Sequence, residues 1–420
     1  MRTPRGRSGA AAAQNAEGTQ AAQGNHRAPD AAGQKVVRLG QLRPVQALLR
    51  SKQSTSQAGF TSERIPARLF SRRPILFDNG PTHDQHRKEL ARFFSANNLR
   101  RRHGAFIEQT AQQFVAKAAV APTCVLDELC LHFSVRVASE IVGLTAGNTE
   151  DLAGRLEAFL RQPPVDHTLP DHGRSSKEWI RAAHGALLPL MSFYLQDVRP
   201  AIRRHRAHPQ EDIITHLLEK GYRPREVLME CLTYGTAGMV TTREFMSLVM
   251  LRMFDDAALR RRYLGSASAE RFRLLEEIIR LNPPVSHLYR RVQKSGGGCP
   301  HQPGTMVDID VAATNTDATV FTPDPLEFCP ERSLSASERT GLSFGDGDHR
   351  CPGSHLAILE TDALVHALLR AGAVMESPPA HHFNTLVQGY QLRDFVISFR
   401  AHLVAEQSGQ DAPSGAEEPG

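Results

Sequence analysis

Residues 344–360 read FGDGDHRCPGSHLAILE, a glycine-rich loop that runs through one cysteine, Cys351, into a helical pattern. The two glycines of FGDG predict a tight loop with accessible backbone N–H groups, and Pro352 suits the first position of a helix. An apolar stripe then continues as far as Gly372, which is expected to end that helix. The pattern therefore places the Cys351 thiol at the start of a helix.

The surroundings of this thiol favour a metal ligand. A helix N-terminus and the neighbouring His349 and Arg350 are expected to lower the pKa of Cys351, and a thiolate binds metals well. Simpler interpretations stay open, because a lone cysteine is often a small buried apolar residue and GDGDHR can form an ordinary turn. Zinc is another alternative, with Cys299 and His301 as further candidates, although the spacing matches no common structural zinc pattern.

The loop resembles the haem-binding loop of cytochromes P-450, Phe-Gly-x-Gly-x-His-x-Cys-x-Gly, and it fills every fixed position. The resemblance implies that Cys351 is the axial ligand of the iron of haem b. It also implies that Phe344, Gly345, His349 and Gly353 belong to the cofactor site, with His349 near a haem propionate.

Two other segments resemble parts of the family that bind the propionates. His83 and Arg87 lie one helical turn apart in a segment that matches the family's first propionate-binding pair, and Arg290 matches another propionate ligand. Arginine suits this role because its planar fork pairs with carboxylates. Arg291 is an alternative to Arg290, because the alignment with the family can shift by one residue. The segment that contains His83 also fits, by itself, a solvated amphipathic helix.

Residues 237–242 read AGMVTT and resemble the helix segment that faces bound oxygen in the family. The resemblance implies that Gly238 leaves room for the ligand, that Thr241 hydrogen-bonds to the oxygen, and that Thr242 is a further catalytic residue. This chain has Val240 where the family usually has an acid. A threonine in a buried helix is otherwise more often bonded to the backbone of its own helix.

A structural lock behind the haem is also implied by the resemblance. Glu277 and Arg280 lie three residues apart, so they can pair on one face of a helix. Arg332, in the segment EFCPER, is the implied third member of an ion-paired lock. Such pairs are common on solvated helices. The prediction therefore rests on the interval between the Glu277–Arg280 pair and the cysteine loop, which matches the family's.

Helical periodicity predicts a mainly α protein with small β-sheets, folded as a single cytochrome P-450-type domain. We expect a disordered tail at 1–35, the haem domain at 36–405 and a disordered acidic tail at 406–420, because the two end segments have few large apolar residues. Strands are expected only after the helix that stops at Pro283-Pro284. The predicted helices cover 44–51, 83–95, 176–206, 223–254 and 269–282.

Composition narrows the function classes. The chain has 420 residues and a formal net charge of +5, but no dense basic run with interleaved aromatics, so nucleic-acid binding is not indicated. It has no long apolar run to span a membrane and no apolar signal core, and its six cysteines form no disulfide-like pattern. These features predict a cytoplasmic protein.

The family resemblance implies a haem-thiolate monooxygenase that inserts one oxygen atom from O2 into a small organic substrate. Electrons would come ultimately from NAD(P)H through a separate ferredoxin and ferredoxin reductase. The alternatives are a reductant-independent peroxygenase, isomerase or dehydratase, a non-catalytic haem-thiolate sensor, and a zinc or thiol enzyme without haem. The expected pocket roof, residues 159–180, carries no chemical signature of the substrate.

Overall fold

The computed structural model describes residues 36–59, 71–296 and 299–400. The predicted tails at 1–35 and 406–420 lie outside these residues. The described part is mainly helical with small sheets, which confirms the predicted fold class.

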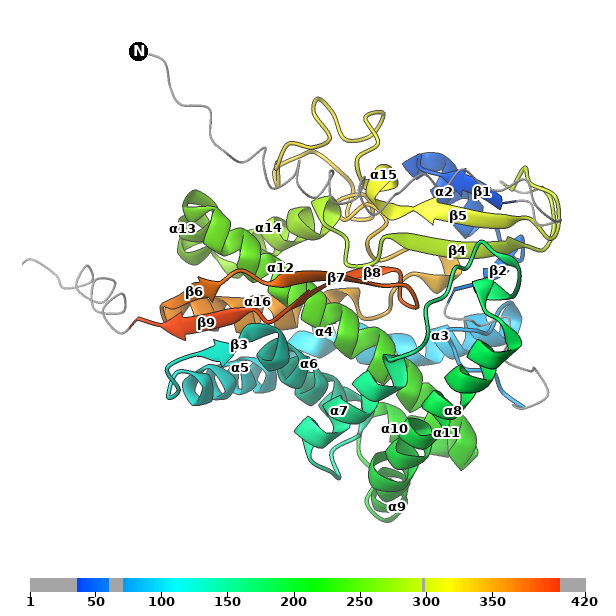
Figure 1. Cartoon of the computed structure of the whole chain (residues 1–420), viewed down its shortest axis with the longest axis horizontal. Coiled ribbons are helices and arrows are strands. Elements are labelled where there is room, and N and C mark those ends of the chain that lie inside the picture. Colours follow the sequence, from blue (N-terminus) through cyan, green and yellow to red (C-terminus); the bar gives the residue numbers. More distant parts are fainter. Residues whose placement is uncertain (1–35, 60–70, 297–298, 401–420) are drawn as a thin grey trace, which may run out of the picture.

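The helices surround a central helical rod that crosses the middle of the molecule (Figure 1). The α-helices are α2 (Leu42–Arg50), α3 (Pro81–Phe94), α4 (Ala96–Asn98), α5 (Gly104–Ala118), α6 (Leu126–Val142), α7 (Thr149–Leu160), α8 (Ser176–Phe193), α9 (Arg199–Ala207), α10 (Ile213–Glu219), α11 (Pro224–Tyr234), α12 (Val240–Asp255), α13 (Ala257–Gly265), α14 (Ser268–Leu281), α15 (Val311–Asn315) and α16 (Ser354–Arg370). The short π and 3-10 segments are η3 (Leu99–His103), η4 (Pro170–Gly173), η5 (Tyr194–Val198), η6 (Gly235–Met239) and η7 (Gly347–His349).

Three small sheets accompany the helical part (Figure 1). The largest has the order β1-β5-β4-β2, in which β1 pairs parallel with β5 and the other pairs are antiparallel. A second sheet has the order β3-β9-β6, and β7 pairs with β8. The strands are β1 (Val36–Leu39), β2 (Thr55–Gln57), β3 (Cys124–Val125), β4 (His287–Val292), β5 (Met306–Asp310), β6 (Ala373–Ser377), β7 (Ala380–Asn384), β8 (Gly389–Arg393) and β9 (Val396–Phe399).

The expectation that strands follow only the 269–282 helix is wrong, because β1, β2 and β3 precede it. These strands are two to four residues long and none of them is fully buried, so they show no clear period-two pattern. They form because β4, β5 and β9 offer free edges for backbone hydrogen bonds. Strand β1 therefore begins the first sheet at the very start of the described chain.

The central rod is α11, η6 and α12, which continue one another as the sequence predicted. Pro224 occupies the start of α11, where its missing N–H costs no hydrogen bond. Gly235 opens the π-helical turn and lies against α7, where an added Cβ would be 2.9 Å from Leu156 Cδ2. This close approach explains why the sequence has glycine there. The rod is buried on most of its circumference, as expected for a helix that is apolar on most sides.

Two apolar clusters hold the fold together. The larger one joins helices from α3 to α16, with the fully buried Phe133, Phe245 and Leu364 among its members. The smaller one packs α2 against the first sheet through Leu48, Ile309 and neighbouring residues.

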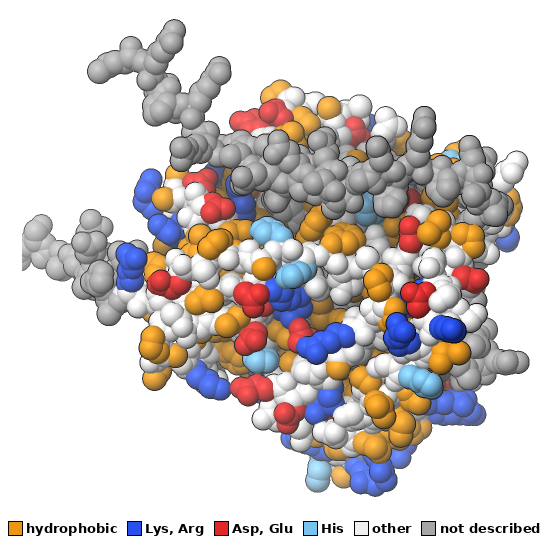
Figure 2. All heavy atoms as spheres, viewed as in Figure 1, with side chains coloured by type: hydrophobic (Ala, Val, Ile, Leu, Met, Phe, Trp, Pro, Cys, Tyr) orange, Lys and Arg blue, Asp and Glu red, His pale blue; other side chains and the backbone are white. Residues whose placement is uncertain are grey.

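The surface carries mixed charges. Figure 2 shows acidic and basic side chains beside one another across the middle of one face. No helix in the described ranges combines the length and apolar character needed to cross a membrane.

Candidate functional site

The cysteine loop is built on two glycines with left-handed backbone. Gly345 has φ 66° and Gly347 has φ 65°, values that side-chain-bearing residues rarely adopt. A Cβ on Gly347 would stand 2.0 Å from the carbonyl oxygen of Leu49, so the loop packs directly on the backbone at the end of α2. The Cys351 N–H donates to the carbonyl of Phe344 at 2.8 Å and closes the loop around the thiol.

Helix α16 starts slightly later than predicted. Gly353 is its N-cap and Ser354 its first residue, so Pro352 lies in the preceding turn rather than at the first helical position. The helix ends before Gly372, which has φ 74°, as the sequence predicted. An added Cβ at Gly353 would lie 4.0 Å from the Cys351 Sγ, which places this glycine directly beside the sulfur.

The predicted lowering of the Cys351 pKa is wrong for the protein without a bound metal. Burial raises the pKa of the thiol, and this outweighs the backbone hydrogen bond from Gly353 and the positive charges of Arg87 and Arg350. The sequence shows which charged residues lie near Cys351. The desolvation of the thiol depends on tertiary packing, which the sequence does not show. A metal ion held by Cys351 would stabilise the thiolate, because coordination displaces the thiol proton.

Three of the predicted cofactor residues line one pocket. His83 on α3, Arg290 on β4 and His349 on η7 meet there, although they come from distant parts of the chain. The His83 and His349 rings lie 4.4 Å apart between centroids. His83 is 1% exposed, yet neither of its ring nitrogens has a hydrogen-bond partner. This pocket therefore contains two buried ring nitrogens that lack hydrogen-bond partners.

Arg290 adds a buried positive charge to the pocket. The side chain is 4% exposed, and burial lowers its pKa to about 10. Its Nη1 donates to the carbonyl of Tyr289 at 2.8 Å, and no carboxylate among the described residues forms an ion pair with it. Arg291, the alternative by register, points instead toward the carbonyl of Gly304 at 3.1 Å.

Arg87 lies on the sulfur side of the loop. It donates to the carbonyl of Arg350, and the pKa of its guanidinium is lowered by burial despite the attraction of Cys351. Both residues of the predicted pair therefore contact the cysteine loop, His83 through the His349 ring and Arg87 through the carbonyl of Arg350.

Sequence reasoning missed two residues that hold this site in place. Asn79 lies 3.2 Å from His349 Nε2 through its Oδ1, and Arg50 pairs with Asp346 at 2.8 and 3.1 Å. Asn79 and Arg50 are far in sequence from the residues they contact. No local pattern signals such pairings.

The donor set fits an iron porphyrin. Cys351 would supply one soft sulfur ligand, and the unpartnered ring of His83, the buried guanidinium of Arg290 and the ring of His349 would suit carboxylates. Zinc has less support, because the described residues contain no group of three or more His, Cys, Asp or Glu side chains arranged around a common point.

The AGMVTT segment crosses from η6 into α12. An added Cβ on Gly238 would meet no atom within 4 Å, so open space lies beside this residue. The hydroxyl of Thr241 donates to the carbonyl of Ala237 at 2.7 Å, and that of Thr242 donates to the carbonyl of Gly238 at 2.6 Å. Val240 is buried in an apolar cluster with Leu160 and Val387.

The Glu277–Arg280 pair is buried and bidentate. Both N–O distances are 2.7 Å, and the side chains are 4% and 0% exposed. Arg332 joins them through the backbone instead of through an ion pair, because it and Arg280 both donate to the carbonyl of Glu327, at 3.1 and 3.4 Å. The predicted three-residue lock is therefore an ion pair with Arg332 attached by main-chain hydrogen bonds.

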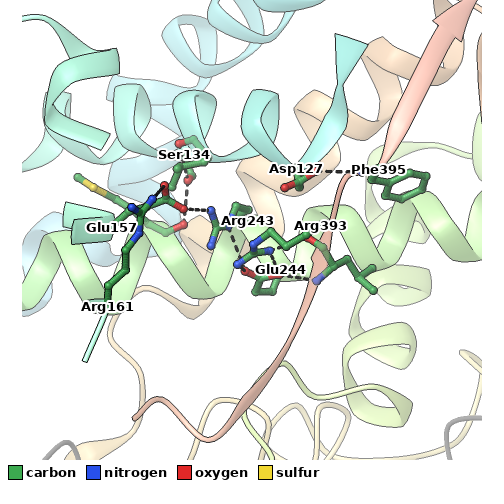
Figure 3. A network of polar contacts seen from close by, with 11 residues as sticks. Asp127, Ser134, Glu157, Arg161, Arg243, Glu244, Arg393 and Phe395 are labelled. Carbon is green, nitrogen blue, oxygen red and sulfur yellow. Dashed lines mark hydrogen bonds and ion pairs between the residues drawn. The ribbon is translucent and has the colours of Figure 1, made fainter. Parts of the chain in front are cut away.

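A second ion network follows directly after Thr242 (Figure 3). Arg243 pairs with Glu157 of α7 and with Glu244, and Glu244 pairs with Arg393 at 2.7 Å. The Leu392 N–H also donates to Glu244 at 3.1 Å. This network ties α12 to α7 and β8 beside the AGMVTT segment. Sequence reasoning did not find it, since charged residues in a buried helix gave no indication of their partners.

Comparison with known proteins points to one family. The family model for Cytochrome P450 matches residues 273–378. The chain is 26% identical over 281 residues to the erythromycin C-12 hydroxylase of Saccharopolyspora erythraea, which covers 63% of this chain and 66% of that protein. It is 23% identical over 309 residues to the biotin biosynthesis cytochrome P450 of Bacillus subtilis, covering 70% and 72%. A match to a probable cytochrome P450 28d2 of Drosophila melanogaster spans 46% of that protein. The chain thus spans about half of the Drosophila protein and about two thirds of the erythromycin C-12 hydroxylase.

The fold is shared with solved structures. A mutant of P450 EryK in complex with erythromycin B superposes with a TM-score of 0.72 at 20% identity, over 92% of this chain and 97% of that chain. CYP109B1 from Bacillus subtilis superposes with a TM-score of 0.69 at 20% identity, over 87% and 93%.

Proposed function

We propose that this chain, which matches the family model for Cytochrome P450 over residues 273–378, is a member of that family, binds haem b through Cys351 and acts as a monooxygenase on a small organic substrate. One oxygen atom of O2 would enter the substrate and the other would leave as water, with two electrons and two protons consumed. The observation that carries this proposal is the pocket beside the Cys351 loop, where the buried, unpartnered ring of His83 meets Arg290 and His349.

Haem bound to a thiolate supplies the oxygen-activating chemistry, because electron density from the sulfur favours cleavage of the O–O bond. Cys351 is the residue that would hold the iron. His83, Arg290 and His349 would orient the propionates, and Phe344, Gly345 and Gly353 would shape the loop around the sulfur. Arg87 would neutralise negative charge on the Cys351 side.

The central rod would form the other wall of the site. The open space beside Gly238 offers room for a small ligand, and the hydroxyls of Thr241 and Thr242 lie next to it in sequence. Thr241 would hydrogen-bond to the reacting oxygen and Thr242 would support it. Buried Val240 cannot exchange protons, so protons must come from another group.

The substrate is proposed as a small organic molecule without further definition. The relatives are named for different reactions, among them an erythromycin C-12 hydroxylase and a vitamin D(3) 25-hydroxylase. The roof expected over the pocket holds a strained turn, with Asp171 at φ 51° and His172 at φ 55°. Such strain often marks residues that shape a binding site.

Electrons are proposed to come from NAD(P)H through a ferredoxin and its reductase in the cytoplasm. Exposed basic side chains on α3 and η3, including Lys88, Arg92 and Arg101, form a surface that suits an acidic partner. Charge complementarity of this kind steers association and weakens as salt is added.

The test is the spectrum of the reduced protein with carbon monoxide. Wild type is expected to show the long-wavelength band typical of thiolate ligation, and Cys351→Ala is expected to lose it. Cys329→Ala, which changes another partly exposed cysteine, is the matched control and should keep the band. Haem binding with an unchanged band in Cys351→Ala would refute the ligand assignment.

A reductant-independent peroxygenase is the second candidate, and the apolar Val240 favours it. Product formation with NADPH, ferredoxin and reductase supports the monooxygenase. Product formation with hydrogen peroxide but not with the electron-transfer proteins supports the peroxygenase.

A further inference from the structure

The solvent-facing side of helix α8 carries an apolar stripe. Its members are the large side chains Ile180 (58% exposed), Leu187 (50%), Leu188 (74%) and Met191 (51%) on α8, and Leu195 (49%) in η5 directly after it. They are five of the eight large apolar side chains that the described residues leave exposed. Such a concentration of exposed apolar surface usually marks a site of interaction.

Helical geometry places the stripe on one side of α8. At about 100° per residue, its four members on α8 fall within an arc of about 100°, and Leu195 follows one turn later. Ala182 and Phe193, on the opposite side of the helix, are buried. Figure 2 shows apolar side chains gathered over this part of α8, at the lower right of the molecule. The stripe therefore takes no part in packing the described residues together.

The charges along α8 and the following helix α9 are positive. Over residues 179–210 the sequence has one acidic residue, Asp197, which is buried and paired with Arg155 at 2.7 Å. Glu178, just before this range, accepts hydrogen bonds from the Ser175 N–H and hydroxyl at 2.8 and 2.7 Å and caps α8. The exposed cationic side chains are Lys177, Arg181, Arg199, Arg203, Arg204 and Arg206. The stripe thus lies between positive charges, which favours a partner that carries negative charge.

These charges argue against a second copy of the chain as the partner. A two-fold symmetric contact would lay the stripe antiparallel against itself. It would bring Lys177 and Arg181 of one copy near Arg199 of the second copy, where like charges repel each other.

The shape of the stripe favours a membrane over a protein. A stable protein interface typically uses about 20–30 residues on each side, whereas the stripe is a single row of five side chains on one convex helix. An apolar stripe with cations beside it is typical of a helix that lies in the headgroup layer of a bilayer. There the apolar side chains enter the acyl boundary and the cations contact anionic headgroups.

We propose that the α8 stripe binds the surface of a membrane that contains anionic lipids. The helix would lie parallel to the bilayer, with Leu188 and Met191 below the headgroups and Arg199 and Arg203 beside the lipid phosphates. The contact is peripheral, and it uses neither the Cys351 loop nor turnover. The inference is therefore independent of the proposed oxygenase function.

The first arm of the test measures binding of the haem-loaded protein to vesicles. The protein is sedimented with phosphatidylcholine vesicles that contain or lack phosphatidylglycerol, at low and at high salt. Wild type should bind the vesicles with phosphatidylglycerol more tightly than those without it. Added salt should weaken this binding, because it screens the attraction between arginines and headgroups.

Trp179 reports which part of the protein meets the vesicle. It is the only tryptophan of the chain and directly precedes Ile180 at the start of the stripe. Its fluorescence emission should shift to shorter wavelength when anionic vesicles bind. Lipids brominated on their acyl chains should quench it.

The second arm removes the centre of the stripe. Leu188→Gln/Met191→Gln should weaken vesicle binding about tenfold or more, because two exposed apolar side chains no longer leave water on binding. The matched control is Val120→Gln/Leu326→Gln, which changes two exposed apolar residues outside the stripe, at 87% and 63% exposure. This control should bind like wild type.

The third arm changes the charges. Arg199→Glu/Arg203→Glu should weaken binding to the anionic vesicles and flatten its salt dependence. Arg261→Glu/Arg370→Glu makes the same change in net charge at exposed positions on α13 and α16 and should retain most of the binding. Melting temperatures and carbon monoxide spectra show that each variant is folded and holds its haem as wild type does. If Leu188→Gln/Met191→Gln melts earlier, Leu188→Gln alone, at the most exposed stripe residue, takes its place.

Each outcome decides the inference. Binding that shifts the Trp179 emission and is lost in the stripe variant but kept in both controls supports it. Absence of binding to phosphatidylglycerol vesicles, an unshifted Trp179 emission, or equal binding in the stripe variant would overturn it. Without vesicle binding, dimers that the stripe variant abolishes would assign the stripe to a second copy. Binding of an acidic ferredoxin that this variant abolishes would assign it to a protein, and either result overturns the membrane assignment.

Discussion

Replacing Glu277 with alanine tests whether the ion pair on α14 holds the fold behind the site. Glu277→Ala removes both carboxylate oxygens that contact Arg280 at 2.7 Å. Arg280 is 0% exposed and would keep three backbone acceptors, the carbonyls of Asn315, Pro325 and Glu327. Its guanidinium would also remain 4.7 Å from the Phe321 ring. The charge would therefore stay buried without a counter-charge.

The expected cost follows from this burial. Removing one partner of a buried ion pair typically destabilises a protein by about 3–5 kcal/mol. The Cys329 N–H, which donates to Glu277 at 3.0 Å, also loses its acceptor, and an unsatisfied buried donor costs about 1–3 kcal/mol. The hydrogen bonds left to Arg280 offset part of the sum, so we expect a loss of about 3–5 kcal/mol in the free energy of unfolding.

The assay is urea unfolding followed by circular dichroism, with haem content measured in parallel. Glu276→Ala is the matched control on the same helix, because its pair with Arg339 is partly exposed, at 22% and 36%. Such a pair contributes about 1 kcal/mol or less. If Glu277→Ala unfolds at the same urea concentration as Glu276→Ala and retains its haem, the reasoning about a buried lock is wrong.

Three further predictions concern docking, the loop and pH. Reversing Arg92 and Arg101 to Glu should slow electron transfer from an acidic ferredoxin and flatten its salt dependence in stopped-flow measurements, and an unchanged rate would place the docking surface elsewhere. Gly347→Ala should reduce haem retention, because its Cβ would stand 2.0 Å from a backbone oxygen. The control Gly154→Ala has open space beside it in α7 and should be neutral or stabilise the fold by about 0.5–1 kcal/mol. Equal haem contents in the two variants would contradict this prediction. Burial raises the pKa of Glu230 from 4.5 to about 8, so the folded protein binds this proton more tightly than the unfolded chain does. Protonated Glu230 therefore stabilises the folded state at low pH, and this stabilisation is lost as the pH rises from about 4.5 through 8. Unfolding free energies should therefore fall more steeply over that range in wild type than in Glu230→Gln, and parallel curves would refute the shift.

The sequence by itself determined the helical class, the long central helix and the cysteine loop. These features depend on local rules, namely helical periodicity, the position of proline at a helix start and the need for glycine at positive φ. The metal-binding character of the loop was also visible in the sequence, because its glycines and its cysteine lie within a few residues of one another. The resemblance to cytochromes P-450 followed from that loop, and the match of the family model over residues 273–378, which include the loop, agrees with it.

The tertiary structure decided what depends on residues far apart in the chain. It brought His83, Arg290 and His349 together, turned Arg87 toward the cysteine loop, and joined Arg332 to the lock through backbone carbonyls. It also reversed the expected pKa shift of Cys351. Desolvation and hydrogen-bond partners are set by which surfaces pack against each other. Sequence spacing does not encode that packing, because residues on different elements meet only after the chain has folded.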